Sequence, residues 1–142
     1  MQITRHTDFS LRLLILLSLQ EKDLLLTIDS AASKLNIPKN HLAKVAHKLA
    51  QHGYIKTVRG NQGGISLAKQ SQSIFLGHVV RAMEMNLEMV DCNKPSCPLS
   101  GCCDLKGILD DARDAFLSTL DKYTLADIAK QSVELKSRFI LS

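Results

Sequence analysis

The sequence predicts a mainly α-helical fold with a small β-wing: a winged helix-turn-helix head followed by a long dimerisation helix. Three observations predict this fold. Leucines recur at helical spacing over residues 9–19, two further helical segments meet at a turn over residues 36–38, and two short strands flank a glycine-rich run at 59–64. Helix, turn, helix and a glycine-tipped hairpin in this order are typical of a winged helix.

The first helix is expected to begin near Asp8 and to run through the leucine-rich stretch, because a polar pair precedes the apolar periodicity there. A short strand is expected at residues 24–27. Thr27 or Asp29 can then cap a small helix over residues 30–35. These two helices are the first two of the predicted DNA-binding head.

A further helix is predicted from residue 39 to about residue 52, after the proline-containing turn. Its apolar side chains share one face, and its basic and polar side chains lie on the other. In a helix-turn-helix module the N-terminal residues of this helix reach base edges in the major groove. A solvated basic face is the simpler alternative. The expected DNA contacts from this helix are Lys39, Asn40, His41, Lys44 and Lys48.

The predicted wing consists of strands at residues 54–58 and 65–67 joined by the run RGNQGG. An arginine at a wing suits the minor groove, whose negative potential attracts guanidinium, and glycines let the backbone approach phosphate. A hairpin that only needs positive φ angles is the alternative reading of the glycines. The expected DNA contacts from the wing are Arg59, Asn61, Gly63 and Gly64.

Charge divides the chain in two. Residues 1–72 carry ten Lys and Arg against four Asp and Glu, a net +6, whereas residues 73–142 carry eight against ten, a net −2. Lysine and arginine contacts to phosphates release counterions and supply most nonspecific DNA affinity. We therefore expect residues 1–72 to be the DNA-binding domain and its partner to be double-stranded operator DNA.

Four cysteines fall within twelve residues, and the chain has no others: Cys92, Cys97, Cys102 and Cys103. Their spacing lacks the short paired hooks of structural zinc sites. A loop with two prolines and a glycine can place its thiolates around a group larger than a single metal ion, which favours an iron–sulfur cluster over zinc. Disulfides rank third, because no recognisable leader peptide precedes the head and we expect a cytoplasmic protein.

The second half is expected to serve assembly. Residues 73–103 provide a connecting helix and the cysteine-rich loop, and residues 104–142 provide a long helix and a tail in which Thr124 can cap a helix over 125–131. No apolar run approaches the roughly 20 residues of a membrane span, so no membrane partner is expected. The long helix carries an apolar stripe that fits a homodimer with paired DNA half-sites, although such a stripe also fits an intramolecular core: Leu105, Ile108, Leu109, Ala112, Phe116 and Leu120.

Several motifs together resemble one known family. They are MQITRHTDFSLR at residues 1–12, NHLAKV at 40–45, GYIKTVRGNQGGI at 53–65, LGHVVRAME at 76–84 and YTLADI at 123–128. In these motifs and in its cysteine loop the chain is similar to the IscR/NsrR-type (BadM-like) family of bacterial winged-helix iron–sulfur regulators, and in particular to its nitric-oxide-sensing repressors. The similarity covers nearly the whole chain.

The resemblance implies a role for the loop cysteines. In such repressors three loop cysteines hold the cluster, and the third stands just before a short stretch leading into Leu-Lys. The matching residues are Cys92, Cys97 and Cys103, followed by DLK at 104–106. Cys102 is an additional thiol, which leaves it open as an alternative third ligand.

The resemblance also implies a fourth ligand, Asp8 of the partner subunit. An alternative role for this carboxylate is a favourable interaction with the helix dipole, worth about 0.3–1 kcal/mol. The IscR branch has a histidine three residues after its third cysteine, a position that Lys106 occupies here. A 4Fe-4S cluster therefore ranks above a 2Fe-2S cluster.

The implied function is a repressor that releases operator DNA when nitric oxide nitrosylates its cluster or when the cluster is lost. An iron- or redox-responsive regulator of the same family is the first alternative. A DNA-binding protein stapled by zinc or disulfides, without sensing, is an alternative of another class. Catalysis is not expected, because the sequence shows no nucleophile–base pair, phosphate loop or paired carboxylates.

Overall fold

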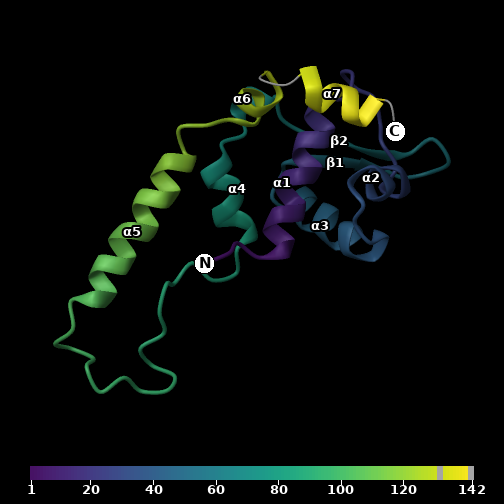
Figure 1. Cartoon of the computed structure of the whole chain (residues 1–142). Helices are drawn as coiled ribbons and strands as arrows, with labels where there is room; N and C mark the ends of the chain where they lie inside the picture. The colour runs from purple at the N-terminus through teal and green to yellow at the C-terminus, as the bar shows by residue number, and fades with distance from the viewer. Residues whose placement is uncertain (131–132, 141–142) are drawn as a thin grey trace.

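The computed structural model describes residues 1–130 and 133–140 and confirms the predicted fold class, mainly α-helical with a two-stranded wing. The head lies at one side of the molecule, and a long helix projects from the other side (Figure 1). The elements in order are α1 (Arg5–Ser18), α2 (Ile28–Leu35), α3 (Lys39–Gln51), β1 (Ile55–Val58), β2 (Gly64–Leu67), the short 3-10 helix η1 (Ser71–Ser73), α4 (Leu76–Met83), α5 (Leu105–Leu120), α6 (Leu125–Lys130) and α7 (Val133–Ile140).

Helix α1 begins one turn earlier than the sequence predicted. Thr4 is its N-cap, and the Thr4 hydroxyl oxygen accepts a hydrogen bond from the Thr7 backbone N–H at 3.3 Å. The predicted start near Asp8 was wrong because the cap is a threonine lying outside the apolar periodicity. Asp8 consequently lies inside the helix, on its first turn.

The connection from α1 to α2 also differs from the prediction. The expected strand at 24–27 reduces to a single bridge between Leu26 and Ile65, because Thr27 already serves as the N-cap of α2. Helix α2 starts at Ile28 rather than at residue 30. Of the two predicted caps, Thr27 is the one used, and its side chain accepts from the Ser30 N–H at 3.1 Å.

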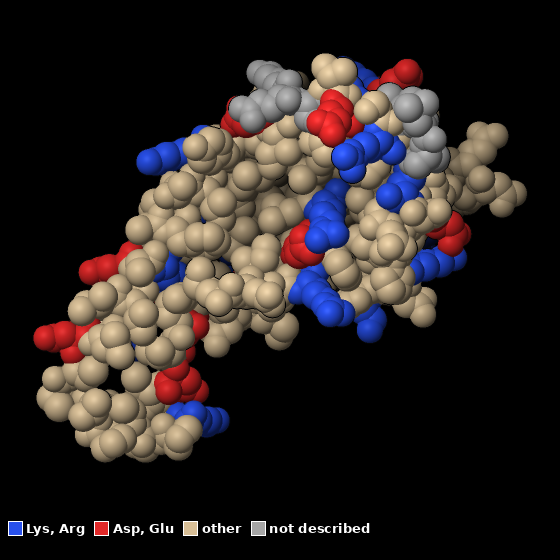
Figure 2. Space-filling model, in the orientation of Figure 1, with Lys and Arg blue, Asp and Glu red and all other residues tan. Residues whose placement is uncertain are grey.

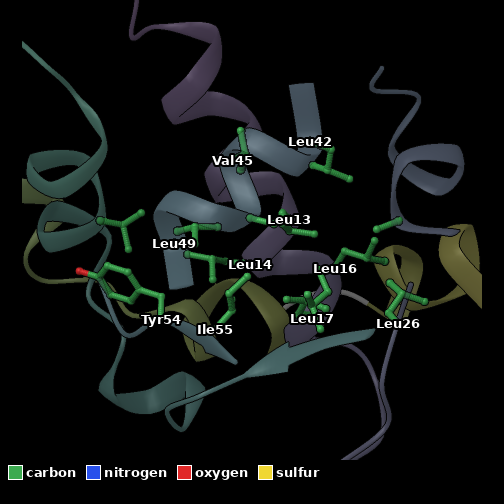
Figure 3. Packing of buried hydrophobic residues seen from close by; sticks show 14 of the residues in the cluster. Leu13, Leu14, Leu16, Leu17, Leu26, Leu42, Val45, Leu49, Tyr54 and Ile55 are labelled. Carbon is green, nitrogen blue, oxygen red and sulfur yellow. The ribbon is translucent and has the colours of Figure 1, made fainter. Parts of the chain in front are cut away.

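Helix α3 starts at the predicted residue and packs its apolar face against α1. Figure 3 shows Leu13 and Leu14 of α1 meeting Leu42, Val45 and Leu49 of α3 in one cluster. All five side chains are fully buried. The antiparallel wing follows, with Ile55 opposite Leu67 and Val58 opposite Gly64. The core therefore fixes α3 on the head with its polar face outward.

Helices α4 and α5 are joined at their ends by a charged pair. Two guanidinium nitrogens of Arg81 donate to the two carboxylate oxygens of Asp121, at 2.6 and 2.8 Å. Gly77 allows this approach, because a Cβ there would clash with the Asp121 carboxylate. Between the two helices, residues 84–104 form a loop without helix or strand that carries all four cysteines.

Helices α6 and α7 return to the head. Leu125 is fully buried in the core cluster that α1 and α3 build. On α7, the Phe139 carbonyl accepts a hydrogen bond from Lys34 Nζ at 2.8 Å. The predicted end of the α6 helix at residue 131 lies outside the described residues. Within residues 1–130 and 133–140, no helix has both the length and the apolar character of a membrane span.

Candidate cluster-binding loop and DNA-binding face

Three of the four cysteines line one cavity of about 250 Å³ at the tip of the loop. They are Cys92, Cys97 and Cys103, and apolar side chains such as Leu99 share the wall with them. Cys102 does not line the cavity, and its thiol donates instead to the Leu99 carbonyl at 3.4 Å. The three cysteines that face a common space are the three that the sequence predicted as cluster ligands.

Hydrogen bonds within the loop shape this cavity. The Cys97 N–H donates to the Cys92 carbonyl at 3.0 Å, and the Asp91 carboxylate accepts from the Asn93 N–H at 2.8 Å. Lys106 lies on the cavity wall and donates to Asp110 at 2.8 Å. This hydrogen bond is the main cause of the raised pKa of Lys106, with a smaller contribution from the nearby Cys92. A positive charge therefore stands beside the thiols.

The loop thiols are available as metal ligands. All four cysteines are free of disulfides. Within the described part of the chain, no three His, Cys, Asp or Glu side chains converge closely enough to hold one metal ion. A tetrahedral zinc site requires four ligands within about 2.0–2.3 Å of the metal. Cysteine thiolates are ligands of zinc and of iron–sulfur clusters alike.

Asp8 is not part of the cavity within one chain. It is absent from the cavity lining, and α1 lies beside the head whereas the cysteine loop lies at the far end of α5 (Figure 1). Its carboxylate is paired with Arg12 on the same helix, at 2.8 Å. Within one chain, the Asp8 carboxylate is therefore separate from the cysteine loop.

The N-terminal part of α3 presents several of the predicted DNA contacts at the surface. Lys39 and Asn40 are exposed, and Lys39 Nζ is 2.7 Å from the Asp29 carboxylate. Lys44 is exposed and forms no hydrogen bond or ion pair within the described residues. The His41 ring is partly buried edge-on against Phe9, with ring centroids 5.2 Å apart. Figure 2 shows a group of Lys and Arg side chains over the head, together with some carboxylates, and further carboxylates along α5.

Lys48 is placed differently from the other basic residues of α3. Its side chain is only partly exposed, and Nζ donates to the Met83 carbonyl at the end of α4, at 3.2 Å. Periodicity assigned Lys48 to the polar face but could not reveal that α4 ends beside it. The ammonium group is thus engaged with the protein's own backbone.

The wing exposes Arg59 and Asn61 at its tip. Its glycines meet the requirements of the hairpin itself. Gly60 has a φ of 111°, and a Cβ on Gly63 would clash with the Val58 carbonyl oxygen. A Cβ on Gly64 would lie 2.7 Å from the carbonyl oxygen of Leu26. The turn therefore needs glycine whether or not it also approaches phosphate.

Sequence reasoning missed a junction where α1, α3 and α4 meet. The Thr4 N–H donates to Glu84 Oε1 at 2.6 Å across 80 positions of sequence, beside the Lys48–Met83 contact. His6 Nε2 is buried there without a partner among the described residues. The His6 pKa is lowered, mainly by burial and also by the charges of Lys48 and His41. No local sequence pattern predicts these contacts, because each of them joins residues from separate helices.

Solved structures of similar shape support the fold. CymR, described as the global cysteine regulator of B. subtilis, superposes with a TM-score of 0.76 at 24% identity, over 93% of this chain and 98% of that chain. The IscR of T. potens superposes with a TM-score of 0.77 at 21% identity, over 95% and 90%. At these identities the likeness is one of fold.

Sequence comparisons identify the family. The NsrR transcriptional regulator of Halalkalibacterium halodurans is 44% identical over 140 residues, 96% of each chain. The NsrR regulator of Bacillus subtilis is 42% identical over 138 residues, covering 95% of this chain and 94% of its own. A family model described as "Iron-dependent Transcriptional regulator" matches residues 3–131. The chain is therefore no enzyme but a DNA-binding transcriptional regulator, and it belongs to the Rrf2 family.

Proposed function

We propose that this regulator is a homodimeric repressor that senses nitric oxide through an iron–sulfur cluster and releases operator DNA when the cluster is nitrosylated or lost. The observation that carries this proposal is the cavity lined by Cys92, Cys97 and Cys103. The similarity of the whole chain to regulators named NsrR supports the choice of effector.

The three cavity thiolates hold the cluster in this proposal, with Asp8 of the partner subunit as the fourth ligand. A 4Fe-4S cluster is favoured, because Lys106 stands three residues after the third cysteine, where the IscR branch has a histidine. When bound, the cluster supplies iron that reacts with nitric oxide. The ammonium of Lys106 offsets the negative charge of the thiolates, and exposed apolar side chains such as Leu99 and Leu105 share the cavity wall.

The DNA-binding face combines the start of α3 with the wing. Lys39, Asn40, His41 and Lys44 approach the major groove, because the core holds α3 with this edge outward. The wing enters the adjacent minor groove, where its exposed guanidinium meets strong negative potential. The wing residues of this face are Arg59, Asn61, Gly63 and Gly64.

Dimerisation occurs through α5. Its apolar stripe is exposed in the single chain, since Leu105, Ile108 and Phe116 are 57%, 62% and 37% exposed. An exposed contiguous apolar surface marks an interaction site. A symmetric dimer would bury this face and set the two α3 helices against successive major grooves, about 34–36 Å apart.

The proposal divides the chain by role. Residues 1–72 read DNA, residues 73–103 connect the head to the cluster, and residues 104–142 assemble the dimer and return to the head. Because operator DNA is the partner, we place the protein in the cytoplasm.

Purification without oxygen tests the proposal. We expect a coloured protein with broad visible absorbance, iron and acid-labile sulfide that binds operator DNA tightly and releases it on addition of nitric oxide. An iron chelator applied for the same time should leave both the cluster absorbance and the bound DNA unchanged, which separates nitric oxide sensing from iron sensing. A colourless protein containing zinc that binds the operator with or without nitric oxide would contradict the proposal.

A further inference from the structure

The last turn of α4, from which the cysteine loop departs, is held by contacts from two other helices of the head. From α3, Lys48 Nζ donates to the Met83 carbonyl at 3.2 Å. From the start of α1, the Thr4 N–H donates to the Glu84 carboxylate at 2.6 Å. Met83 itself is 1% exposed and belongs to the core cluster. The point where the loop begins is therefore fixed to both α1 and α3.

Both contacts have favourable electrostatics. Thr4 is the N-cap of α1, and Glu84 satisfies its N–H as the glutamate of a capping box does, although it comes from another helix. A carboxylate near a helix N-terminus and an ammonium near a helix C-terminus both interact favourably with the helix dipoles. Lys48 also satisfies a terminal carbonyl that α4 leaves without an intrahelical partner.

The junction also includes His6, near the start of α1. Its side chain is half-buried, and its Nε2 is buried without a hydrogen-bond partner among the described residues. One turn along α1, the Asp8 N–H donates to the Thr4 carbonyl at 2.9 Å. A displacement of the end of α4 would therefore disturb its hydrogen bonds to the start of α1 and to α3 at the same time.

We propose that Lys48 and Glu84 are positioning residues that couple the cysteine loop to the recognition helix α3. This inference rests on the proposed function and deepens it. In this role Lys48 does not neutralise a DNA phosphate. It holds α3 against the end of α4, so that a change in the loop alters the presentation of Lys44 and its neighbours to DNA.

The salt dependence of operator binding by the cluster-free protein tests the role of Lys48. Replacing a phosphate-contacting lysine lowers the slope of log affinity against log salt by about one. We expect this decrease for Lys44→Met, which serves as the matched control, and an unchanged slope for Lys48→Met. An equal decrease in both variants would overturn the proposal, because Lys48 would then be a phosphate contact.

The ratio of operator affinities with and without the cluster tests the coupling. Allosteric couplings typically correspond to about 5–150-fold. We expect Lys48→Met and Glu84→Ala to bring this ratio close to one while cluster content, measured by iron and sulfide, remains that of the wild type. Lys48→Arg keeps the donor and the charge and should retain the ratio, which controls for misfolding. A wild-type ratio in Lys48→Met would refute the coupling.

The two proposals fail in different ways. If the wild-type protein binds the operator equally well with and without the cluster, the proposed sensing function is wrong and the coupling inferred here falls with it. If the wild type shows the dependence and the variants preserve it, only the coupling is wrong. The salt slopes decide the role of Lys48 in either case.

Discussion

Asp8 and Arg12 form a two-point ion pair one turn apart on α1. Arg12 Nη2 lies 2.8 Å from Asp8 Oδ2, and Arg12 Nε donates to Asp8 Oδ1 at 2.9 Å. The Arg12 side chain is 53% exposed and the Asp8 side chain is 34% exposed. Pairs of this spacing on an exposed helix surface are worth about 0.3–0.5 kcal/mol. The Asp8 carboxylate can therefore exchange Arg12 for another cation at little cost to the fold.

Replacing Asp8 with alanine separates sensing from stability. We expect Asp8→Ala to shift the free energy of unfolding by less than about 1 kcal/mol, because only a surface ion pair and a first-turn carboxylate are lost. The variant should retain a cluster on its three thiolates. It should lose most of the increase in operator affinity that the cluster confers. Unchanged operator affinity and nitric oxide response would exclude Asp8 as a ligand.

The loop cysteines should differ in their contribution to the cluster. Cys103→Ala removes a thiol that lines the cavity and should abolish visible absorbance and sulfide content. Cys102→Ala removes a thiol that points to the Leu99 carbonyl and should retain both. Equal losses in the two variants, measured after identical anaerobic preparation, would show that Cys102 also holds the cluster.

The apolar stripe of α5 should control the oligomeric state. Ile108 is 62% exposed in the single chain, so Ile108→Asp should leave the monomer folded but place a carboxylate in the proposed dimer interface. Light scattering should show a shift from dimer to monomer at micromolar concentration. Ser118→Asp, on an exposed part of the same helix outside the apolar stripe, is the control and should remain dimeric.

The Arg81–Asp121 pair should give the stability a specific pH dependence. Its hydrogen bonds with Arg81 lower the pKa of Asp121 below the ordinary value of 3.8. The pair therefore stabilises the fold at pH values above 3.8, and this contribution is lost as the pH falls through the pKa of the folded state. Urea denaturation should show Asp121→Asn less stable than the wild type at pH 6, with the difference shrinking below pH 4. A constant difference across this range would contradict the assignment.

The head was largely predictable because its signals are local. The apolar periodicity of α3 and the glycines of the wing placed both elements within one or two residues of their observed bounds. The start of α1 was missed because Thr4 caps a turn without apolar residues. The expected strand at 24–27 is limited to one bridge at Leu26, because Thr27 is the N-cap of α2.

The remaining features depend on contacts between distant parts of the chain. Spacing alone left Cys102 and Cys103 equivalent, whereas the folded loop puts only Cys103 on the cavity wall. A helical wheel assigned Lys48 to the DNA face, but the end of α4 lies within its reach. The carboxylate of Glu84 at the cap of α1 is likewise visible only in the folded chain.

The most direct test of the account is a titration of the anaerobic, cluster-loaded protein with nitric oxide, with visible absorbance and the anisotropy of labelled operator DNA followed in one cuvette. If the cluster controls DNA binding, both signals change together and reach their end points at the same ratio of nitric oxide to cluster. Absorbance that bleaches fully while the operator stays bound would contradict the claim that the cluster controls DNA binding.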